Sequence, residues 1–108
     1  MSFKVTQLTQ QALLNLKPVI DAVARHDRDL ARQLRRSASS IYLNLAEAEG
    51  SRAGNQRKHF DIALGSAKET RANLNLARCW GYADANKVDQ QLDIICAMLW
   101  RMTHRRPA

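Results

Sequence analysis

Apolar residues recur at intervals of three or four along four segments of this 108-residue sequence, and turn-forming residues separate the segments. That spacing places the apolar side chains on one face of an α-helix, which makes one turn in about 3.6 residues. No segment shows the sustained two-residue alternation that is typical of a half-buried strand. The pattern therefore predicts an all-α protein built from four amphipathic helices.

The first predicted helix runs from about residue 6 to residue 26, and Pro18 inside it predicts a kink because proline lacks the amide for a helical hydrogen bond. Short connections between four helices favour antiparallel neighbours. The predicted fold is thus an up-down antiparallel four-helix bundle, a single domain over residues 1–108. The expected core stripes of the later helices are Leu30, Leu34, Ala38, Ile41, Leu45 and Ala48, then Phe60, Ala63, Ala67, Thr70, Leu74 and Ala77, then Val88, Leu92, Ile95, Leu99 and Met102.

Helix boundaries are expected at residues that cap helices well. Asp27 or Asp29 is predicted to cap the second helix, and Asn55 the third, because their side-chain oxygens can accept hydrogen bonds from the first free amides. Gly81 is predicted to end the third helix, and Asp84 to cap the fourth.

The last helix has more apolar surface than one core face can use. Residues 94–100 form an uninterrupted apolar run, and successive helical residues step about 100° around the axis, so the run covers the whole circumference. Ile94, Met98 and Trp100 therefore need another partner. We expect them to form an oligomer interface; the alternative is that the kinked first helix or the chain ends cover them.

The charge balance favours anionic partners, and no segment is long enough to cross a membrane. Seventeen Lys and Arg residues against ten Asp and Glu give a net charge of +7, which attracts polyanions over a distance. The longest apolar run, residues 94–100, is far shorter than the roughly 20 residues that cross a bilayer. The first residues also lack the basic-then-apolar build of a secretion signal. We expect a cytoplasmic protein that does not bind membranes.

Two basic clusters could bind nucleic-acid phosphates without reading sequence. On the second helix, Arg28, Arg32 and Arg35 fall within about 60° of one another on the face opposite the core, flanked by Arg36. The other cluster would gather at one end of an antiparallel bundle and comprises Arg52, Arg57, Lys58, Arg101, Arg105 and Arg106. The alternatives are a solvated helix face for the first cluster and cations that complement the carboxyl end of a helix for the second.

Polar residues beside the core stripes indicate contact between the second and third helices. Ser40, Asn44 and Glu47 are spaced by four and three residues, so they share a helix face, and Ser66 and Glu69 lie three apart just after Gly65. We predict that these five polar residues form a buried hydrogen-bond network that holds the helices in register. The alternative is a ligand or metal pocket lined by Glu47 and Glu69.

Catalytic motifs are missing from the sequence. It contains no glycine-rich phosphate loop, no Cys-x-x-Cys and no His-Glu-x-x-His. We expect a protein without catalytic residues, bound metal or cofactor, and hence not an enzyme.

Two stretches resemble a known family. Residues 33–47 (Gln-Leu-Arg-Arg-Ser-Ala-Ser-Ser-Ile-Tyr-Leu-Asn-Leu-Ala-Glu) and residues 60–69 (Phe-Asp-Ile-Ala-Leu-Gly-Ser-Ala-Lys-Glu), continuing to Leu74 and Ala77, are similar to the signatures of bacterial four-helix bundle proteins. The genes of that family often lie in intervening sequences of large-subunit ribosomal RNA. The chain departs from the family pattern at Tyr42, where proline is common, and at Ala48, where glycine is common.

The resemblance implies an up-down bundle assembled as a ring, typically a homopentamer. Some relatives are accessory proteins of diversity-generating retroelements, which bind a reverse transcriptase and nucleic acid through basic surfaces. The shared Asn and Glu positions of the family correspond to Asn44, Glu47 and Glu69, and the resemblance gives them no catalytic role. Our first hypothesis is therefore a ring-forming bundle that binds RNA or DNA. The alternative is a structural scaffold for a protein partner, without nucleic-acid binding.

Overall fold

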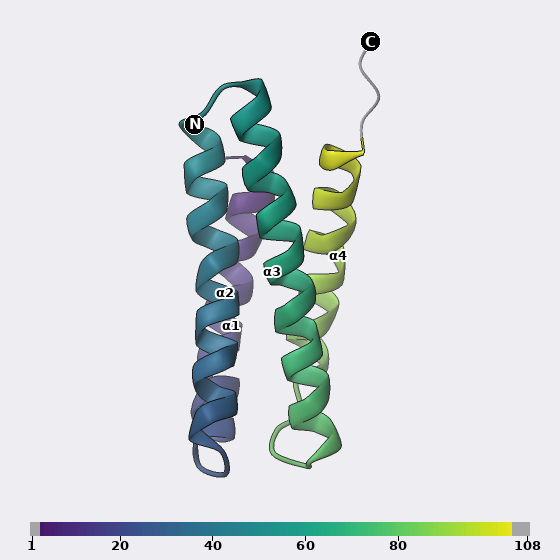
Figure 1. Ribbon diagram of the computed structural model, residues 1–108. Helices are drawn as coiled ribbons and strands as arrows, with labels where there is room; N and C mark the ends of the chain where they lie inside the picture. Colours follow the sequence, from purple (N-terminus) through teal and green to yellow (C-terminus); the bar gives the residue numbers. More distant parts are fainter. Residues whose placement is uncertain (1–2, 105–108) are drawn as a thin grey trace.

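The computed structural model describes residues 3–104, and throughout that range the chain forms four α-helices and no β-strand (Figure 1). Helix α1 spans Lys4–Ala24, α2 spans Arg28–Glu49, α3 spans Ala53–Cys79 and α4 spans Asn86–Thr103. They pack into an elongated bundle of 48 × 20 × 19 Å. The predicted all-α bundle of four helices is confirmed.

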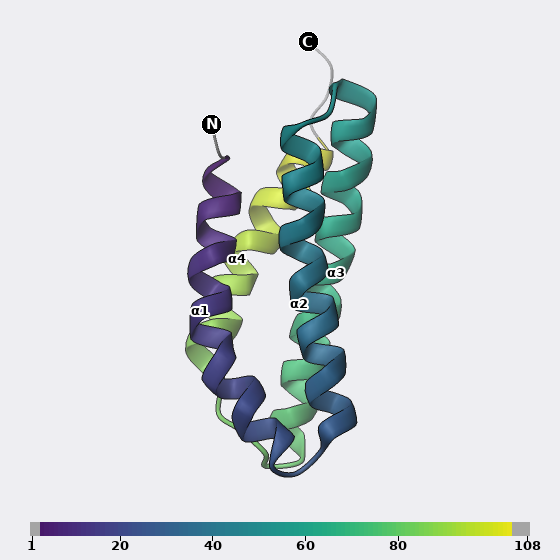
Figure 2. The same ribbon diagram turned by 90° about the vertical axis from the view of Figure 1, so that its left-hand side faces the viewer.

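The connections between helices lie at alternating ends of the bundle. The α1–α2 turn and the α3–α4 turn are at the bottom of Figure 1, which we call the lower end, whereas the α2–α3 turn lies at the upper end. Each helix packs against the next one along the chain, and α1 also packs against α4. The four helices thus surround one shared core, as the rotated view shows (Figure 2).

The core consists of the stripes that the helical spacing predicts. Every predicted position on α2 and α3 is buried, and so are those on α4 except Met102, which is half-buried. Alanine fills three of the α3 positions, namely Ala63, Ala67 and Ala77. Such small side chains let two helix backbones approach closely, and the α2–α3 contact is the most extensive in the bundle.

Two of the predicted helix ends are confirmed. Asp27 is the N-cap of α2, where its carboxylate accepts a hydrogen bond from the Leu30 amide at 2.9 Å. Gly81 follows α3 with a φ of +75°, a conformation that glycine adopts without a steric penalty. Its amide donates to the Arg78 carbonyl and the Tyr82 amide donates to the Ala77 carbonyl, the paired bonds of a Schellman motif.

The predicted cap of α3 is wrong. The helix begins at Ala53 with Arg52 as its N-cap, two residues before Asn55 is reached. The first turn is already closed by a hydrogen bond from the Gln56 amide to the Arg52 carbonyl, while the Gln56 side chain donates to the Ala48 carbonyl at the end of α2. Asn55 therefore lies in the first turn of the helix and not at its N-cap.

The start of α4 differs from the prediction by one residue. Ala85 occupies the N-cap position, with Asp84 immediately before it. The Asp84 carboxylate still accepts a hydrogen bond from the Asn86 amide, at 3.2 Å. In α1 the helix continues through Pro18, and its lower turns bend toward α2 (Figure 2).

Two leucines on α2 test this packing with the same substitution. Leu45 is fully buried, whereas the side chain of Leu43 is 60% exposed. We expect Leu45→Ala to lower the free energy of unfolding by about 2–5 kcal/mol because it leaves a cavity. Leu43→Ala is expected to change it by less than about 0.5 kcal/mol. Chemical denaturation followed by circular dichroism measures both, and equal losses would contradict the orientation of α2.

Candidate nucleic-acid interface

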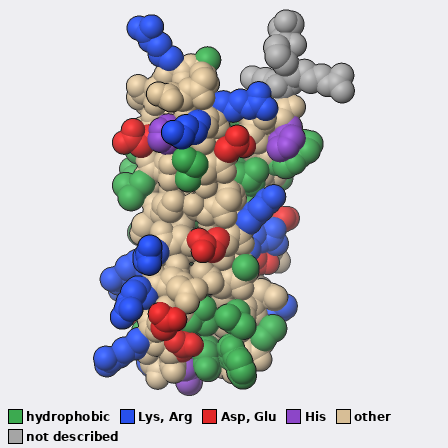
Figure 3. Space-filling view, in the orientation of Figure 1, with side chains coloured by type: hydrophobic (Ala, Val, Ile, Leu, Met, Phe, Trp, Pro, Cys, Tyr) green, Lys and Arg blue, Asp and Glu red, His purple; other side chains and the backbone are tan. Residues whose placement is uncertain are grey.

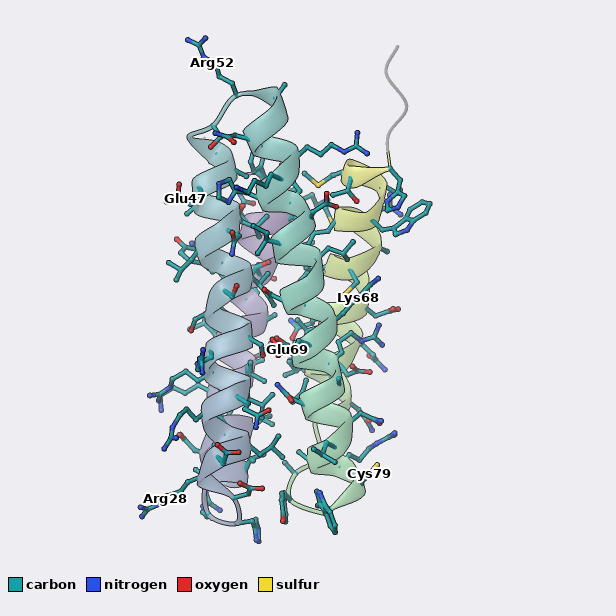
Figure 4. The ribbon with its side chains drawn as sticks, in the orientation of Figure 1. Arg28, Glu47, Arg52, Lys68, Glu69 and Cys79 are labelled. Atoms are coloured by element: carbon teal, nitrogen blue, oxygen red, sulfur yellow. The ribbon has the colours of Figure 1, made fainter. Side chains whose placement is uncertain are left out.

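Arg28, Arg32 and Arg35 form a continuous stripe on the outer side of α2, which we call the arginine stripe. All three side chains are exposed, and they line the groove between α2 and α1. At about 1.5 Å per residue the stripe covers roughly 10 Å of the helix axis. Figure 4 shows Arg28 at the lower end of α2, projecting away from the bundle. The structure thus brings together the three arginines that the helical wheel predicted to share a face.

The groove beside the arginine stripe has little opposing charge. Its acidic side chain is Asp21 on α1, which accepts a hydrogen bond from Lys17 at 3.2 Å. The rest of this lining is apolar and includes Ile20, Ala24 and Ala31. Figure 3 shows the blue side chains gathered along the lower part of α2. The local potential along the arginine stripe is therefore positive.

Arg36 lies apart from the arginine stripe. It lines the groove on the other side of α2, between α2 and α3, together with Asp29 and Glu69. One helical step of 100° is enough to move a side chain from one groove to the next. Arg36 therefore faces a different groove from the three residues that it was predicted to flank.

The second predicted cluster lies at the upper end but has mixed charge. Arg52, Arg57, Lys58 and Arg101 are all exposed, and Figure 4 shows Arg52 projecting from the α2–α3 turn. Acidic side chains share this end of the bundle, namely Glu47 and Glu49 at the end of α2 and Asp61 near the start of α3. The remaining members, Arg105 and Arg106, lie outside the described residues. Within residues 3–104, the arginine stripe is the more uniformly positive surface.

The predicted polar residues on α2 and α3 meet in a hydrogen-bonded seam. The hydroxyl oxygens of Ser40 and Ser66 are 2.7 Å apart. The Asn44 side-chain amide donates to the Ser40 carbonyl at 2.9 Å, and its oxygen lies 3.0 Å from Nδ1 of His59. The hydroxyl of Thr70 continues the seam, 2.8 Å from both the Ser37 hydroxyl and the Ser66 carbonyl oxygen.

The two glutamates predicted for this network are not buried. Glu47 and Glu69 are both exposed, because each lies on a helix flank well away from the core stripe. Ser37 and Thr70 are the buried members in their place. Ser37 precedes Ser40 by three residues, so the spacing that pointed to Ser40 and Asn44 could have found it as well.

A charged cluster joins α3 to α4. Arg71 donates hydrogen bonds to Asp89 and to Asp93, each at 2.9 Å. The hydrogen bond that Arg71 donates to Asp89, together with the negative charges of Asp89 and Asp93, raises the pKa of Arg71. Next to this cluster, burial raises the pKa of the Cys96 thiol, which disfavours the reactive thiolate. Arg71 is thus engaged within the bundle and contributes little to an anion-binding surface.

The predicted oligomer interface on α4 is divided between two flanks. Ile94 and Trp100 are 55% and 51% exposed, and Met98 is half-buried. Ile94 and Met98 lie toward α1, on the flank of Gln91, whose oxygen accepts a hydrogen bond from Asn15 at 3.1 Å. Trp100 lies toward α3 and stacks on His104 with ring centroids 4.1 Å apart. These three side chains therefore do not form a single patch.

Leu14 on α1 is an exposed apolar residue that the sequence reasoning missed. Its side chain is 77% exposed and lines the groove between α1 and the start of α4. A signal was available, because no charged residue stands between Lys4 and Lys17. Depletion of charge is typical of the core of a protein interface. Leu14 and Ile94 mark what we call the α1–α4 face.

No three His, Cys, Asp or Glu side chains among residues 3–104 come close enough together to hold a metal ion. In the same range no helix combines the length and apolar character that crossing a bilayer requires.

Comparisons with known proteins identify relatives of this bundle. Residues 2–102 match the family described as 23S rRNA-intervening sequence protein. Among solved structures, a protein of unknown function from the S23 ribosomal protein family of Bacteroides thetaiotaomicron VPI-5482 has the same fold, with a TM-score of 0.84 at 20% sequence identity. The similarity covers 93% of this chain and 98% of that protein. No curated protein matches the sequence.

The hydrogen-bonded seam can be tested with two buried threonines. Thr70→Val removes the hydrogen bond that Thr70 donates to the buried Ser37 hydroxyl, which keeps only its own bond to the Leu34 carbonyl, so we expect a loss of about 0.5–1.5 kcal/mol in the free energy of unfolding. Thr9 is equally buried, but its hydroxyl donates only to the Val5 carbonyl of its own helix. Thr9→Val should change the stability by less than about 0.5 kcal/mol. Similar losses in urea denaturation would show that the seam adds no stability between helices.

Proposed function

The chain belongs to the family of 23S rRNA-intervening sequence proteins, and on that basis we propose that it is a non-enzymatic RNA-binding protein that assembles into a homo-oligomeric ring. The arginine stripe is the observation that carries RNA binding. Its three exposed guanidinium groups lie along consecutive turns of one helix, beside a groove whose acidic residue is paired with Lys17. Guanidinium groups match phosphate oxygens in both charge and geometry.

Binding through the arginine stripe would be mainly electrostatic. Arginines that neutralise phosphates release condensed counterions, and this supplies affinity that falls steeply as salt rises. Because such contacts involve the backbone, they select nucleic acid as a class and carry little sequence information. A ring would repeat the stripe on each subunit, and linked copies bind a long RNA much more tightly than one copy does.

The α1–α4 face supports self-assembly. Leu14 and Ile94 leave 77% and 55% of their side chains in contact with solvent in the single chain. Removing apolar side chains from water contributes about 25 cal/mol per Å², from which the entropy cost of association is subtracted. In the proposed assembly, up-down bundles meet through this face, and five copies close the ring.

A second candidate function is a scaffold that binds a protein such as a reverse transcriptase. Leu43 and Ile62 favour it, because both are exposed and belong to the helices that form the seam. The contacts from Asn44 to His59 and from Ser40 to Ser66 place residues 43 and 62 at the same height on α2 and α3. This apolar pair lies away from the α1–α4 face, so a ring would leave it free for a partner.

Neutralising the arginine stripe tests RNA binding. We expect the triple variant Arg28→Gln, Arg32→Gln, Arg35→Gln to bind a 20-nucleotide RNA hairpin at least about tenfold more weakly and to reduce the salt slope of log affinity by about 2–3. The matched control, Arg52→Gln with Arg57→Gln and Lys58→Gln, removes the same charge from the upper end. Fluorescence anisotropy between 50 and 200 mM KCl, roughly the range over which phosphate contacts are lost, measures both variants.

A smaller effect of the control variant would support the arginine stripe as the binding surface. Equal effects of the two triple variants would show that the stripe contributes only to the net charge of the protein and is not the binding surface. Failure of the unmodified protein to bind the hairpin at the lowest salt would rule out the proposed function.

Acidic substitutions on the α1–α4 face test the ring. The double variant Leu14→Glu, Ile94→Glu would bury carboxylates in the proposed interface, which costs several kcal/mol for each unpaired charge. We therefore expect multi-angle light scattering to show the mass of a single chain for this variant and a multiple of it for the unmodified protein. Leu43→Glu, elsewhere on the surface, should keep the assembled mass. A single-chain mass for the unmodified protein at micromolar concentration would contradict assembly.

A further inference from the structure

Three aromatic rings from two different turns lie nearly parallel at the lower end of the bundle. His26, in the α1–α2 turn, stacks on Tyr82 of the α3–α4 turn with ring centroids 5.0 Å apart and an interplanar angle of 3°. The Trp80 ring lies 6.5 Å from that of Tyr82, at an angle of 21°. The Schellman motif at Gly81 separates Trp80 from Tyr82 and sets the direction in which the chain leaves α3. We call these three rings the aromatic ladder.

One ring of the aromatic ladder, Tyr82, is partly buried, and another, Trp80, is mostly exposed. Tyr82 is half-buried and packs against the core. The Trp80 side chain, in contrast, is 65% exposed, although tryptophan has a large apolar surface that is highly buried on average. Figure 3 shows hydrophobic side chains gathered over the lower part of α3 and the α3–α4 turn. The Trp80 ring thus presents a flat apolar surface to solvent.

Exposed arginines lie at the same end of the bundle as the aromatic ladder, and two carboxylates of the adjoining turns accept hydrogen bonds from backbone amides. Arg25, Arg28 and Arg78 are exposed around this end of the bundle. The carboxylate of Asp27 accepts the Leu30 amide and that of Asp84 accepts the Asn86 amide, so both are bound at helix starts. Arg28 is also the first residue of the arginine stripe, which therefore begins two residues after His26.

We propose that the aromatic ladder is a stacking platform for unpaired bases of single-stranded RNA whose phosphates run along the arginine stripe. This inference rests on the proposed RNA binding and specifies the form of RNA that is bound. Exposed aromatic rings beside arginines stack any base, because every base has a π-face. In a duplex the bases are already paired and stacked, so a duplex can contact the arginine stripe but not the aromatic ladder.

The test compares single-stranded and duplex RNA on tryptophan variants. The two probes are a 12-nucleotide oligouridine and a blunt 12-base-pair duplex. We expect Trp80→Ala to weaken oligouridine binding by about 5- to 100-fold, the range for losing one or more base stacks, and to change duplex binding less than about twofold. Trp80→Phe keeps a ring and should retain most of the affinity. Trp100→Ala removes the other tryptophan, at the upper end, and should leave both affinities unchanged.

A second readout does not depend on a destabilising substitution. In a Trp100→Phe background, Trp80 is the single tryptophan, so its fluorescence reports stacking directly. We expect oligouridine to quench it and the blunt duplex to leave it nearly unchanged. In the reverse background, Trp80→Phe, the fluorescence of Trp100 should respond to neither RNA.

The outcomes separate this inference from the proposed function. If the arginine-stripe variant loses oligouridine but Trp80→Ala does not, RNA binding stands and the stacking platform is wrong. Absence of binding to both RNAs by the unmodified protein would instead overturn the proposed function, and the platform with it. A change in the assembled mass of Trp80→Ala, with oligouridine affinity kept, would show that Trp80 contacts protein and would also overturn the platform.

Discussion

The close contact between α2 and α3 is the constraint on which the rest of the structure depends. Alanines on α3 allow the two backbones to approach, and the hydroxyls of Ser37, Ser40, Ser66 and Thr70 then hydrogen-bond across or along the contact. A buried hydroxyl that loses its partner costs about 1–3 kcal/mol, so sliding one helix along the other is unfavourable. The seam thereby fixes both the height and the rotation of α2 and directs its arginines away from the core.

Many acidic residues form contacts within the bundle, and these contacts determine where positive charge is left without a carboxylate partner. Asp27 caps α2, Asp21 pairs with Lys17, Glu49 accepts the Phe3 amide, and Asp89 and Asp93 hold Arg71. Many of the carboxylates therefore serve the bundle itself, whereas the arginine stripe has no carboxylate partner within residues 3–104. Within residues 3–104, every arginine except Arg71 is exposed. Such an arrangement leaves cations free to meet an external anion.

Of the surface regions that exposed apolar side chains mark, three carry the proposals made above. Leu14 and Ile94 lie on the α1–α4 face, Leu43 and Ile62 flank the seam, and Trp80 stands in the turn at the lower end. Each region differs in its surroundings. The first lies beside an uncharged stretch of α1, while the last lies at the same end of the bundle as exposed arginines. These differences are why we assign the first to self-assembly and the last to nucleobases.

The sequence by itself determined the four helices and their buried faces, because the 3.6-residue period depends only on neighbours along the chain. Asp27 and Gly81 could be predicted as helix ends for the same reason. The tertiary structure alone decided which neighbour each helix flank meets. It directed Arg36 into the groove between α2 and α3, left Glu47 and Glu69 in solvent, and stacked His26 on Tyr82. A helical period sets the angle of a side chain around its own axis, but only the packing of helices distant in sequence sets what that side chain touches.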